Sequence, residues 1–196
     1  IEVMAREPKI CKYLDIPLQH VSDNQLKAMR RRIDKQGSIE LIERLRSRIP
    51  DIALRTTMLV GFPGETEEDF EELLEFVRQT KFERLGAFAY SEEEGTPSAK
   101  MEDDVPAEVK ESRVERLMEL QGSLSLGNNQ RRVGEEMKVI IDSREGDFWI
   151  GRSQYDSPEV DEEILITSAN PLEVGQMVDV RITDCEEYDL YGEVVE

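Results

Sequence analysis

The chain has 196 residues, of which 38% are hydrophobic, and 44 Asp and Glu against 25 Lys and Arg give it a formal net charge of −19. Because nucleic-acid-binding proteins concentrate cations against phosphates, this balance argues against such a surface and indicates either a solubilising surface or a basic protein partner. Two cysteines and one histidine argue against a disulfide framework or an internal metal site. No apolar run reaches the roughly 18 residues that span a membrane and no signal peptide opens the chain, so we expect a cytoplasmic globular protein.

The first fifty residues predict one strand and two helices. Residues 13–20 have the pattern of a strand whose polar carboxyl end holds Gln19 and His20, the only histidine of the chain. Ser22 is suited to cap a short helix, and residues 38–48 predict a second, longer one. A strand followed by helices is the beginning of an α/β pattern.

The central stretch predicts a strand, a glycine turn and a helix in succession. Residues 54–60 are apolar and β-branched, Gly61-Phe-Pro-Gly64 stops the strand, and Thr66 with Asp69 resembles a capping box that opens a helix to about residue 79. In such βα units ligands bind at the carboxyl end of the strand. The turn lacks the lysine of a phosphate-binding loop and the spacing of a dinucleotide fingerprint. It therefore either closes a tight loop and nothing more, or binds a ligand with a ribose and an amino-acid end.

A third strand is predicted at residues 84–90, and Pro106 opens a long helix that runs to about residue 131. Strands and helices therefore alternate as βαβαβ, which predicts a parallel sheet with its functional loops on one rim. Three strands cannot close a barrel. Either the sheet is larger than this chain, or copies of the chain associate through exposed strand edges.

The remaining residues have a different pattern, in which five short β-rich runs are separated by Gly, Asp, Asn and Pro. These runs are residues 137–142, 147–152, 163–168, 177–184 and 188–195. Their spacing predicts a small five-stranded antiparallel barrel. We therefore expect two domains, residues 1–130 and residues 131–196. The second domain holds 6 Lys and Arg against 18 Asp and Glu, so it carries most of the negative charge.

Several motifs together resemble one family, the radical S-adenosylmethionine (SAM) methylthiotransferases. The motifs are Pro17–His20, Leu26–Arg30, Arg55–Thr57, Gly61–Thr66 and Tyr90–Thr96. The last 65 or so residues resemble the TRAM domain that ends these enzymes. The resemblance implies the C-terminal half of a radical SAM (TIM-like) βα barrel, followed by a small OB-like barrel. It covers essentially the whole chain.

The family has two branches, which modify different substrates. One modifies an adenosine of tRNA, and the other adds a methylthio group to the β-carbon of an aspartate on a small-subunit ribosomal protein, the twelfth. Residues 152–161 resemble the second branch, in which the positions matching Asp156, Pro158, Glu159 and Asp161 are characteristic. The acidic charge of the predicted barrel independently favours the second branch, because it would attract a basic ribosomal protein and repel tRNA. The alternatives are the tRNA branch and a binding module without enzymatic activity.

The chain departs from the family in its cysteines. The Cys-x-x-x-Cys-x-x-Cys motif that holds the radical SAM iron–sulfur cluster is absent, and Cys11 and Cys185 cannot supply three thiolate ligands. The resemblance therefore implies a fragment that is inactive by itself. The full-length enzyme would use SAM and two 4Fe-4S clusters, and we expect none of these to be bound by this chain.

The resemblance implies a SAM site made of six residues: Gln19, Ser22, Arg55, Thr57, Gly61 and Tyr90. Gln19 and Ser22 would meet the ribose and amino-acid groups, and Arg55 the SAM carboxylate, which a guanidinium matches in geometry. Gly61 would approach the adenine, and Tyr90 would lie near the adenine or the substrate. The structural alternatives are that Gln19 only satisfies backbone groups and that Arg55 pairs with Asp15 or Glu65.

Five further residues are predicted to face the protein substrate: His20, Trp149, Asp156, Glu159 and Asp161. Phe148 and Trp149 are adjacent in a predicted strand, so one faces inward and the other outward. The outward ring is either an isolated surface aromatic or a substrate contact. A lone histidine is more often structural than functional, and only its position at a strand end favours a role for His20.

Overall fold

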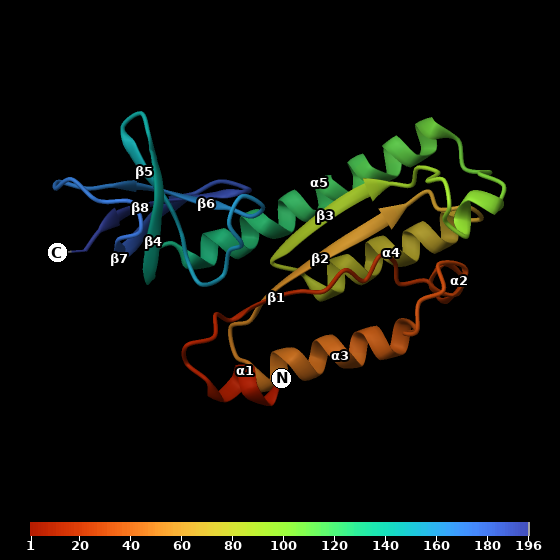
Figure 1. The fold of residues 1–196 in the computed structure, drawn as a ribbon, viewed down its shortest axis with the longest axis horizontal. Coiled ribbons are helices and arrows are strands. Elements are labelled where there is room, and N and C mark those ends of the chain that lie inside the picture. The colour runs from red at the N-terminus through yellow and green to blue at the C-terminus, as the bar shows by residue number, and fades with distance from the viewer. Residues whose placement is uncertain (196) are drawn as a thin grey trace. The chain divides into compact units, whose positions relative to one another are not determined.

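In the computed structural model, which describes residues 1–195, the chain divides into two compact units (Figure 1). Of the described residues, the α/β unit comprises 14–121 together with Ile1, and the barrel unit comprises 2–13 and 122–195. The division falls inside one continuous helix, α5 (Ala107–Arg132). None of the described helices is long and apolar enough to cross a membrane.

The α/β unit is a parallel sheet with helices between its strands, as predicted. Its strands are β1 (Tyr13–Asp15), β2 (Ala53–Val60) and β3 (Arg84–Ala89), in the sheet order β1-β2-β3. Its helical segments are α2 (Asp23–Ala28), α3 (Lys35–Arg48), α4 (Glu67–Thr80), the 3-10 turn η1 (Ser98–Lys100) and the first half of α5. The expected βαβαβ order is confirmed.

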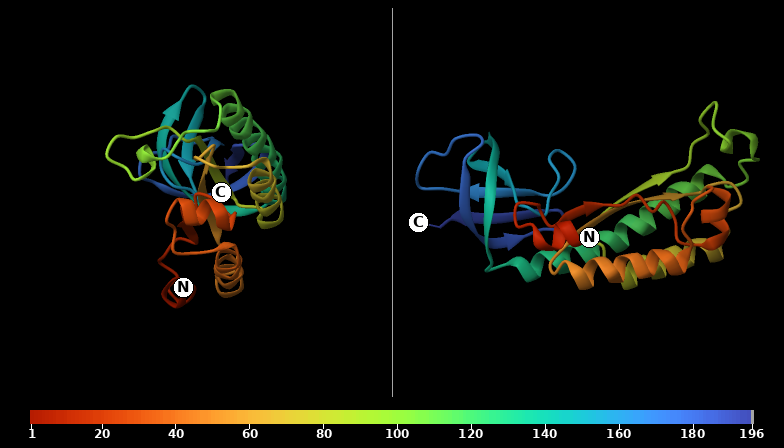
Figure 2. Two further views of the ribbon diagram at one scale, coloured as in Figure 1. Left: turned by 90° about the vertical axis from the view of Figure 1, so that its right-hand side faces the viewer. Right: turned by 60° about the horizontal axis from the view of Figure 1, so that its bottom comes forward.

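The two faces of this sheet differ in burial, because buried and half-buried residues alternate along β2. Leu54, Thr56 and Met58 are buried, whereas Arg55, Thr57 and Leu59 are half-buried. The end-on view in Figure 2 shows α3 and α4 on one side of the strands, which accounts for the buried set. Parallel sheets are normally covered on both faces, so the half-buried, polar face is the candidate ligand face.

The predicted capping box at the start of α4 is confirmed. The Asp69 backbone N–H donates to the Thr66 hydroxyl at 3.1 Å, and the Thr66 N–H donates to the Asp69 carboxylate at 3.0 Å. Three acids in the first turn of α4 complement the positive end of the helix dipole. The predicted apolar stripe of this helix is buried: Phe70, Leu73, Leu74 and Val77. The local sequence therefore fixes the point at which the chain leaves the glycine turn.

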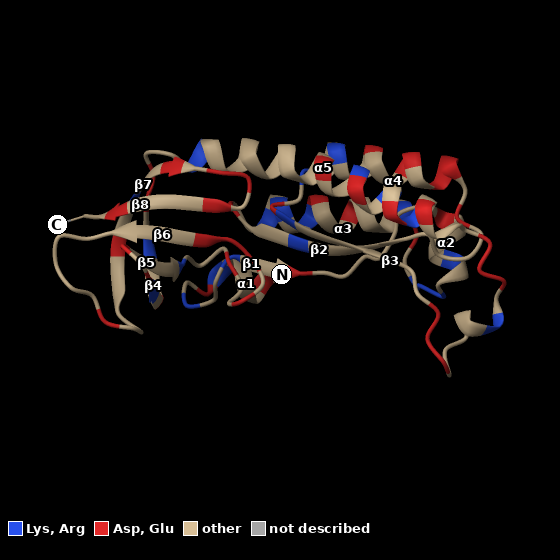
Figure 3. Ribbon diagram, turned by 90° about the horizontal axis from the view of Figure 1, so that it is seen from above, with Lys and Arg blue, Asp and Glu red and all other residues tan. Residues whose placement is uncertain are grey.

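The barrel unit closes in the order β4-β5-β6-β8-β7. Its strands are β4 (Glu136–Glu145), β5 (Phe148–Arg152), β6 (Glu163–Thr167), β7 (Met177–Cys185) and β8 (Asp189–Val194), and its N-terminal segment forms α1 (Glu2–Arg6). Acidic residues lie on β6, β7 and β8 (Figure 3). The five predicted strands are all present.

One of the five strand pairings, between β6 and β8, is parallel, whereas we expected antiparallel pairings throughout. The reason is parity: strand directions cannot alternate around a closed ring that has an odd number of members. A five-stranded barrel must therefore contain at least one parallel pair. The expected barrel is confirmed, and its sheet is mixed.

Two glycines let neighbouring strands approach closely inside this barrel. A Cβ at Gly151 would lie 2.6 Å from a Val139 methyl carbon and 2.7 Å from the Ile140 carbonyl oxygen. A Cβ at Gly192 would collide with Val180. Val139 and Val180 belong to the barrel core, so these glycines are required by packing.

We expect Gly151→Ala to lower the free energy of unfolding of the barrel unit by about 1–3 kcal/mol, because a methyl group there overpacks a filled core. Chemical denaturation followed by Trp149 fluorescence measures the change. The control is Gly127→Ala in α5, where a Cβ has no neighbour within 4 Å. The control should leave stability unchanged or raise it by about 0.5–1 kcal/mol. Equal effects of the two variants would contradict the packing argument.

Candidate functional site

A buried carboxylate, that of Glu65, holds the glycine turn at the carboxyl end of β2. Its Oε1 lies 3.1 Å from His20 Nε2, and its Oε2 accepts hydrogen bonds from the Gly61 N–H and, at 3.0 Å, from Arg113 Nη1. The side chains of Glu65 and His20 are 0% exposed and that of Arg113 is 5% exposed. Because a buried charge is costly unless it is paired and hydrogen-bonded, these contacts fix the turn against α5 and the segment after β1.

His20 lies inside this arrangement with both ring nitrogens engaged. Its Nδ1 accepts the Ser22 backbone N–H at 3.0 Å, so the ring proton is assigned to Nε2, which donates to Glu65. The ring is fully buried. In this arrangement His20 positions the turn and presents no surface to a ligand.

Ser22 takes a different partner from the one that its place before α2 suggests. It is the N-cap residue of α2, but its side chain makes no capping hydrogen bond and instead donates to Asp69 Oδ1. Burial raises the pKa of the Asp69 carboxyl, but hydrogen bonds from Ser22 and Thr66 outweigh burial, so this pKa lies below its ordinary value. Asp69 thus joins the start of α4 to the segment after β1.

Gly61 has a φ of +71° and faces Lys110 of α5. A Cβ at this position would collide with the Lys110 Cγ, so the missing side chain is required by the packing of α5. The Lys110 ammonium donates to the Tyr90 carbonyl at 3.3 Å and pairs with Asp103 at 2.6 Å. The turn, the end of β3 and α5 therefore meet at one lysine.

Tyr90 directly follows β3 and is 7% exposed. Its ring packs edge-on against Phe62, with the ring centroids 5.0 Å apart. Its hydroxyl is buried and has no hydrogen-bond partner among the described residues. A buried hydroxyl without a partner is costly, so a polar group of a bound ligand would be stabilised there.

The half-buried face of the sheet carries the other SAM candidates. Arg55 pairs with Asp15 at 2.8 Å, which is one of the two structural alternatives raised from the sequence. Gln19 has a φ of +75°, its N–H donates to the Thr57 carbonyl at 2.9 Å, and its carbonyl accepts the Leu59 N–H at 2.7 Å. The backbone of Gln19 thus extends the sheet beside β2.

The candidate substrate residues of the barrel unit lie in or near the β5–β6 loop. Asp156 accepts the Ser153 hydroxyl at 2.6 Å, and Asp161 accepts the Tyr13 hydroxyl at 2.6 Å. Both aspartates therefore fix the loop conformation, while Glu159 between them is exposed.

Trp149 lies before this loop, on β5. It is half-buried and packs against the barrel core, with the Arg144 guanidinium 5.2 Å from its ring centroid. Phe148 is also half-buried and packs edge-on against Tyr191. Neither ring stands isolated on the surface.

Sequence reasoning missed the two cations that hold the turn, Lys110 and Arg113. They lie three residues apart on a helix predicted from its apolar positions, where charged residues are expected to be solvated. They are nevertheless buried. No signal in a single sequence connects them with Gly61 and Glu65.

Two sequence families match this chain, in agreement with its two folds. Residues 1–77 match the radical SAM superfamily, and residues 133–195 match the TRAM domain. Part of a radical SAM α/β fold followed by a TRAM barrel defines the class of this protein.

Curated relatives narrow the class to one type of enzyme. The chain is 54% identical to the ribosomal protein uS12 methylthiotransferase RimO of Bacteroides thetaiotaomicron over 98% of this chain and 45% of the relative. It is 50% identical to RimO of Christiangramia forsetii over 98% of this chain and 43% of the relative, and 51% identical to RimO of Parabacteroides distasonis over 100% and 45%. The chain therefore spans less than half the length of these relatives. It is a homologue of part of RimO.

Radical SAM enzymes use iron–sulfur clusters and SAM, and the described residues suit SAM better than a cluster. No group of three or more His, Cys, Asp or Glu that could hold a metal ion occurs in the part of the chain that the structure describes. Cys11 is exposed and Cys185 half-buried, so the iron–sulfur ligands are not supplied by these residues. The polar face of the sheet and the buried Tyr90 hydroxyl suit SAM, which carries a ribose, a carboxylate and an adenine.

We expect Glu65→Gln to lower the free energy of unfolding by about 3 kcal/mol, because it removes the buried carboxylate beside Arg113 and leaves this guanidinium paired with the exposed carboxylate of Glu67. Urea denaturation measures this loss. The matched control is Glu68→Gln, an exposed acid in the first turn of α4, which should cost only about 0.3–1 kcal/mol. A similar loss in both variants would mean that the Glu65 contacts contribute little.

We expect the stabilising effect of Asp69 to depend on pH. Because its pKa is lower in the folded protein, its carboxylate stabilises the fold above the ordinary pKa of about 3.9, and this contribution is lost as pH falls through the folded value. Asp69→Asn should therefore destabilise the protein at neutral pH by about 1–3 kcal/mol. The gap between wild type and variant should shrink at about pH 3 and below. Urea denaturation across this range measures the gap, and a constant gap would contradict the assignment.

Proposed function

We propose that this chain is part of an enzyme that adds a methylthio group to the β-carbon of an aspartate on ribosomal protein uS12. The observation that carries the proposal is the 54% identity with a RimO enzyme over 98% of the chain. The complete enzyme would use SAM and two 4Fe-4S clusters, one of which would supply, in its reduced form, the electron that cleaves SAM. This chain provides one wall of the SAM site and the barrel that recognises uS12. We propose that the enzyme acts in the cytoplasm.

The α/β unit binds and orients SAM in this proposal. Gln19 lies toward the ribose and amino-acid groups, and the buried Ser22 supports this part of the site through its hydrogen bond to Asp69. Arg55 exchanges Asp15 for the SAM carboxylate, which its planar fork binds in the same geometry. Gly61 lies toward the adenine. The rigid turn held by Glu65 supports this role, since a site fixed before binding loses less entropy when the ligand arrives.

Two further residues complete the SAM side of the proposal. Thr57 shares the half-buried face with Arg55, two positions along β2, and offers a hydroxyl to the ligand. The Tyr90 hydroxyl lies near the adenine or the target aspartate. His20 contributes to substrate binding only indirectly, because it fixes the turn and does not contact the substrate.

The barrel unit recognises uS12 in this proposal. Its Asp and Glu outnumber its Lys and Arg, so it steers a basic protein and repels tRNA. Glu159 makes direct contacts, while Asp156 and Asp161 hold the loop that presents it. Trp149 supports the loop from the barrel wall. We propose a domain boundary at residues 130 and 131, close to the start of the TRAM match at residues 133–195, whereas the two compact units divide earlier, between residues 121 and 122.

Titration of this chain with purified uS12 and with tRNA at two salt concentrations tests the proposal. We expect binding to uS12 that weakens as salt rises, because opposite charges attract across the interface, and no binding to tRNA. Analytical ultracentrifugation in parallel detects self-association of the chain, which we propose to occur through the exposed edges of the three-stranded sheet.

Binding to tRNA alone would overturn the choice of branch and favour the tRNA-modifying one. Binding to neither would overturn the assignment of substrate recognition to this chain. A heat-denatured sample of the same chain serves as the control for non-specific attraction between opposite charges.

A further inference from the structure

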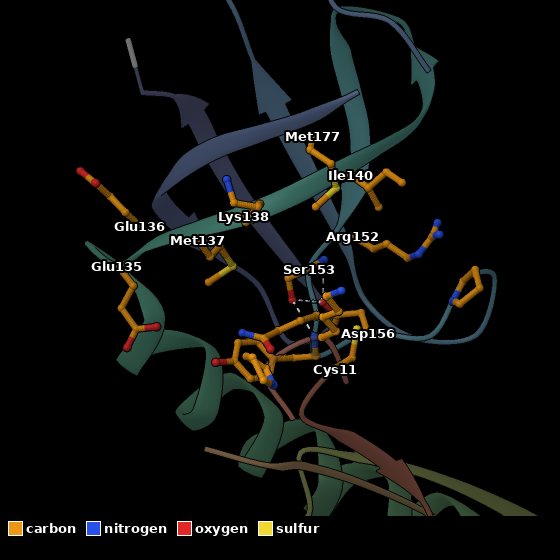
Figure 4. A pocket seen from close by; sticks show the side chains of 15 residues that line it. Cys11, Glu135, Glu136, Met137, Lys138, Ile140, Arg152, Ser153, Asp156 and Met177 are labelled. Carbon is orange, nitrogen blue, oxygen red and sulfur yellow. Dashed lines mark hydrogen bonds between the residues drawn. The ribbon is translucent and has the colours of Figure 1, made fainter. Parts of the chain in front are cut away.

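The barrel unit carries two adjoining pockets that share Arg152 and Pro158 in their walls. The first has a volume of about 730 Å³. Figure 4 shows Met137, Ile140 and Met177 on its barrel wall, and all three are lining residues. Met177 is 56% exposed, so a large apolar side chain is presented to solvent at the mouth of a concave site.

The second pocket, of about 330 Å³, is acidic. Five carboxylates line it, from Asp142, Glu159, Asp161, Glu162 and Glu163, against one cation, Arg152. Some of these acids have partners within the barrel unit: Asp142 pairs with Arg152, and Glu162 accepts the Ser125 hydroxyl at 3.0 Å. Because Arg152 is the one cation among the described lining residues and pairs with Asp142, the carboxylates together give the pocket its excess negative charge, and two of them, Glu159 and Glu163, are exposed.

The pKa of the Glu163 carboxyl reflects both its desolvation and the excess of negative charge around it. Although Glu163 is exposed as a residue, partial desolvation of its carboxyl raises the pKa of this group, and the neighbouring carboxylates of Glu145 and Asp189 raise it further. Like charges held together in this way are relieved by a cation, so the pocket favours a lysine or arginine side chain as its occupant.

We propose that these two pockets form one docking surface for a short segment of a basic protein, with an apolar side chain in the first pocket and a neighbouring lysine or arginine in the second. Because the pockets share a wall, the two side chains lie close together in the segment. The inference rests on the proposed function, which makes uS12 the partner. Charge complementarity favours this occupant over a nucleic acid or over a second copy of a chain with a net charge of −19.

Calorimetric titration of the full chain with uS12 tests the docking surface. Met177→Ser should weaken binding about tenfold, because it removes an apolar side chain that becomes buried on association. Glu163→Gln should weaken it about threefold and reduce its dependence on salt. The matched controls, Val174→Ser and Glu173→Gln, alter exposed residues of the same unit outside both pockets and should change affinity less than about twofold. Thermal unfolding curves establish that all four variants fold.

The outcomes separate the docking surface from the proposed function. If the unsubstituted chain binds uS12 and the pocket variants bind as tightly as the controls, the docking surface is overturned and the function stands. If the unsubstituted chain does not bind uS12, the assignment of substrate recognition to this chain fails and the docking surface fails with it. A dimer of the chain that Met177→Ser dissociates would overturn the choice of occupant.

Discussion

The glycine turn after β2 depends on one buried carboxylate, that of Glu65. A buried charge destabilises a protein unless it is paired and hydrogen-bonded, and here the guanidinium of Arg113, the Gly61 amide and the His20 ring surround it. The three partners come from α5, from the turn itself and from the segment after β1. The conformation of the candidate SAM loop is therefore fixed partly by two residues that are distant in the sequence, His20 and Arg113, and a change in either would alter the loop without touching a ligand.

The barrel depends on a different constraint, the odd number of its strands. Five strands in a closed ring require a parallel pair, and β8 returns beside β6 to provide it. The long loop between β5 and β6 carries the residues with which we associate protein recognition. Asp156 fixes this loop by accepting a hydrogen bond from Ser153 within it, and Asp161 fixes it by accepting one from Tyr13. A rigid barrel thus presents an acidic loop whose conformation is fixed before a partner arrives, which lowers the entropy lost on binding.

The parts of the fold that local sequence determines were predictable, and the contacts across the fold were not. The strands, α4 and its capping box follow from periodicity and from residues within one turn of each other. Ser22 was predicted from its position to cap α2, but it bonds Asp69, because that carboxylate is brought close only by the tertiary fold. The Arg55–Asp15 pair was one of two alternatives that the sequence could not separate. The parallel barrel pair followed from parity, which no local pattern expresses.

Helix α5 belongs to both compact units. Its first half supplies Lys110 and Arg113 to the glycine turn, and its second half supplies Ser125 and Asn129 to the barrel unit, where they donate to Glu162 and to the Glu186 carbonyl. Helix formation is cooperative, so the two halves support each other's hydrogen-bonded turns. Evolutionary exchange of this barrel between proteins is consequently constrained: a barrel inherited without the second half of α5 would lose two of its hydrogen-bond donors, so the transferable module includes the helix as well as the strands.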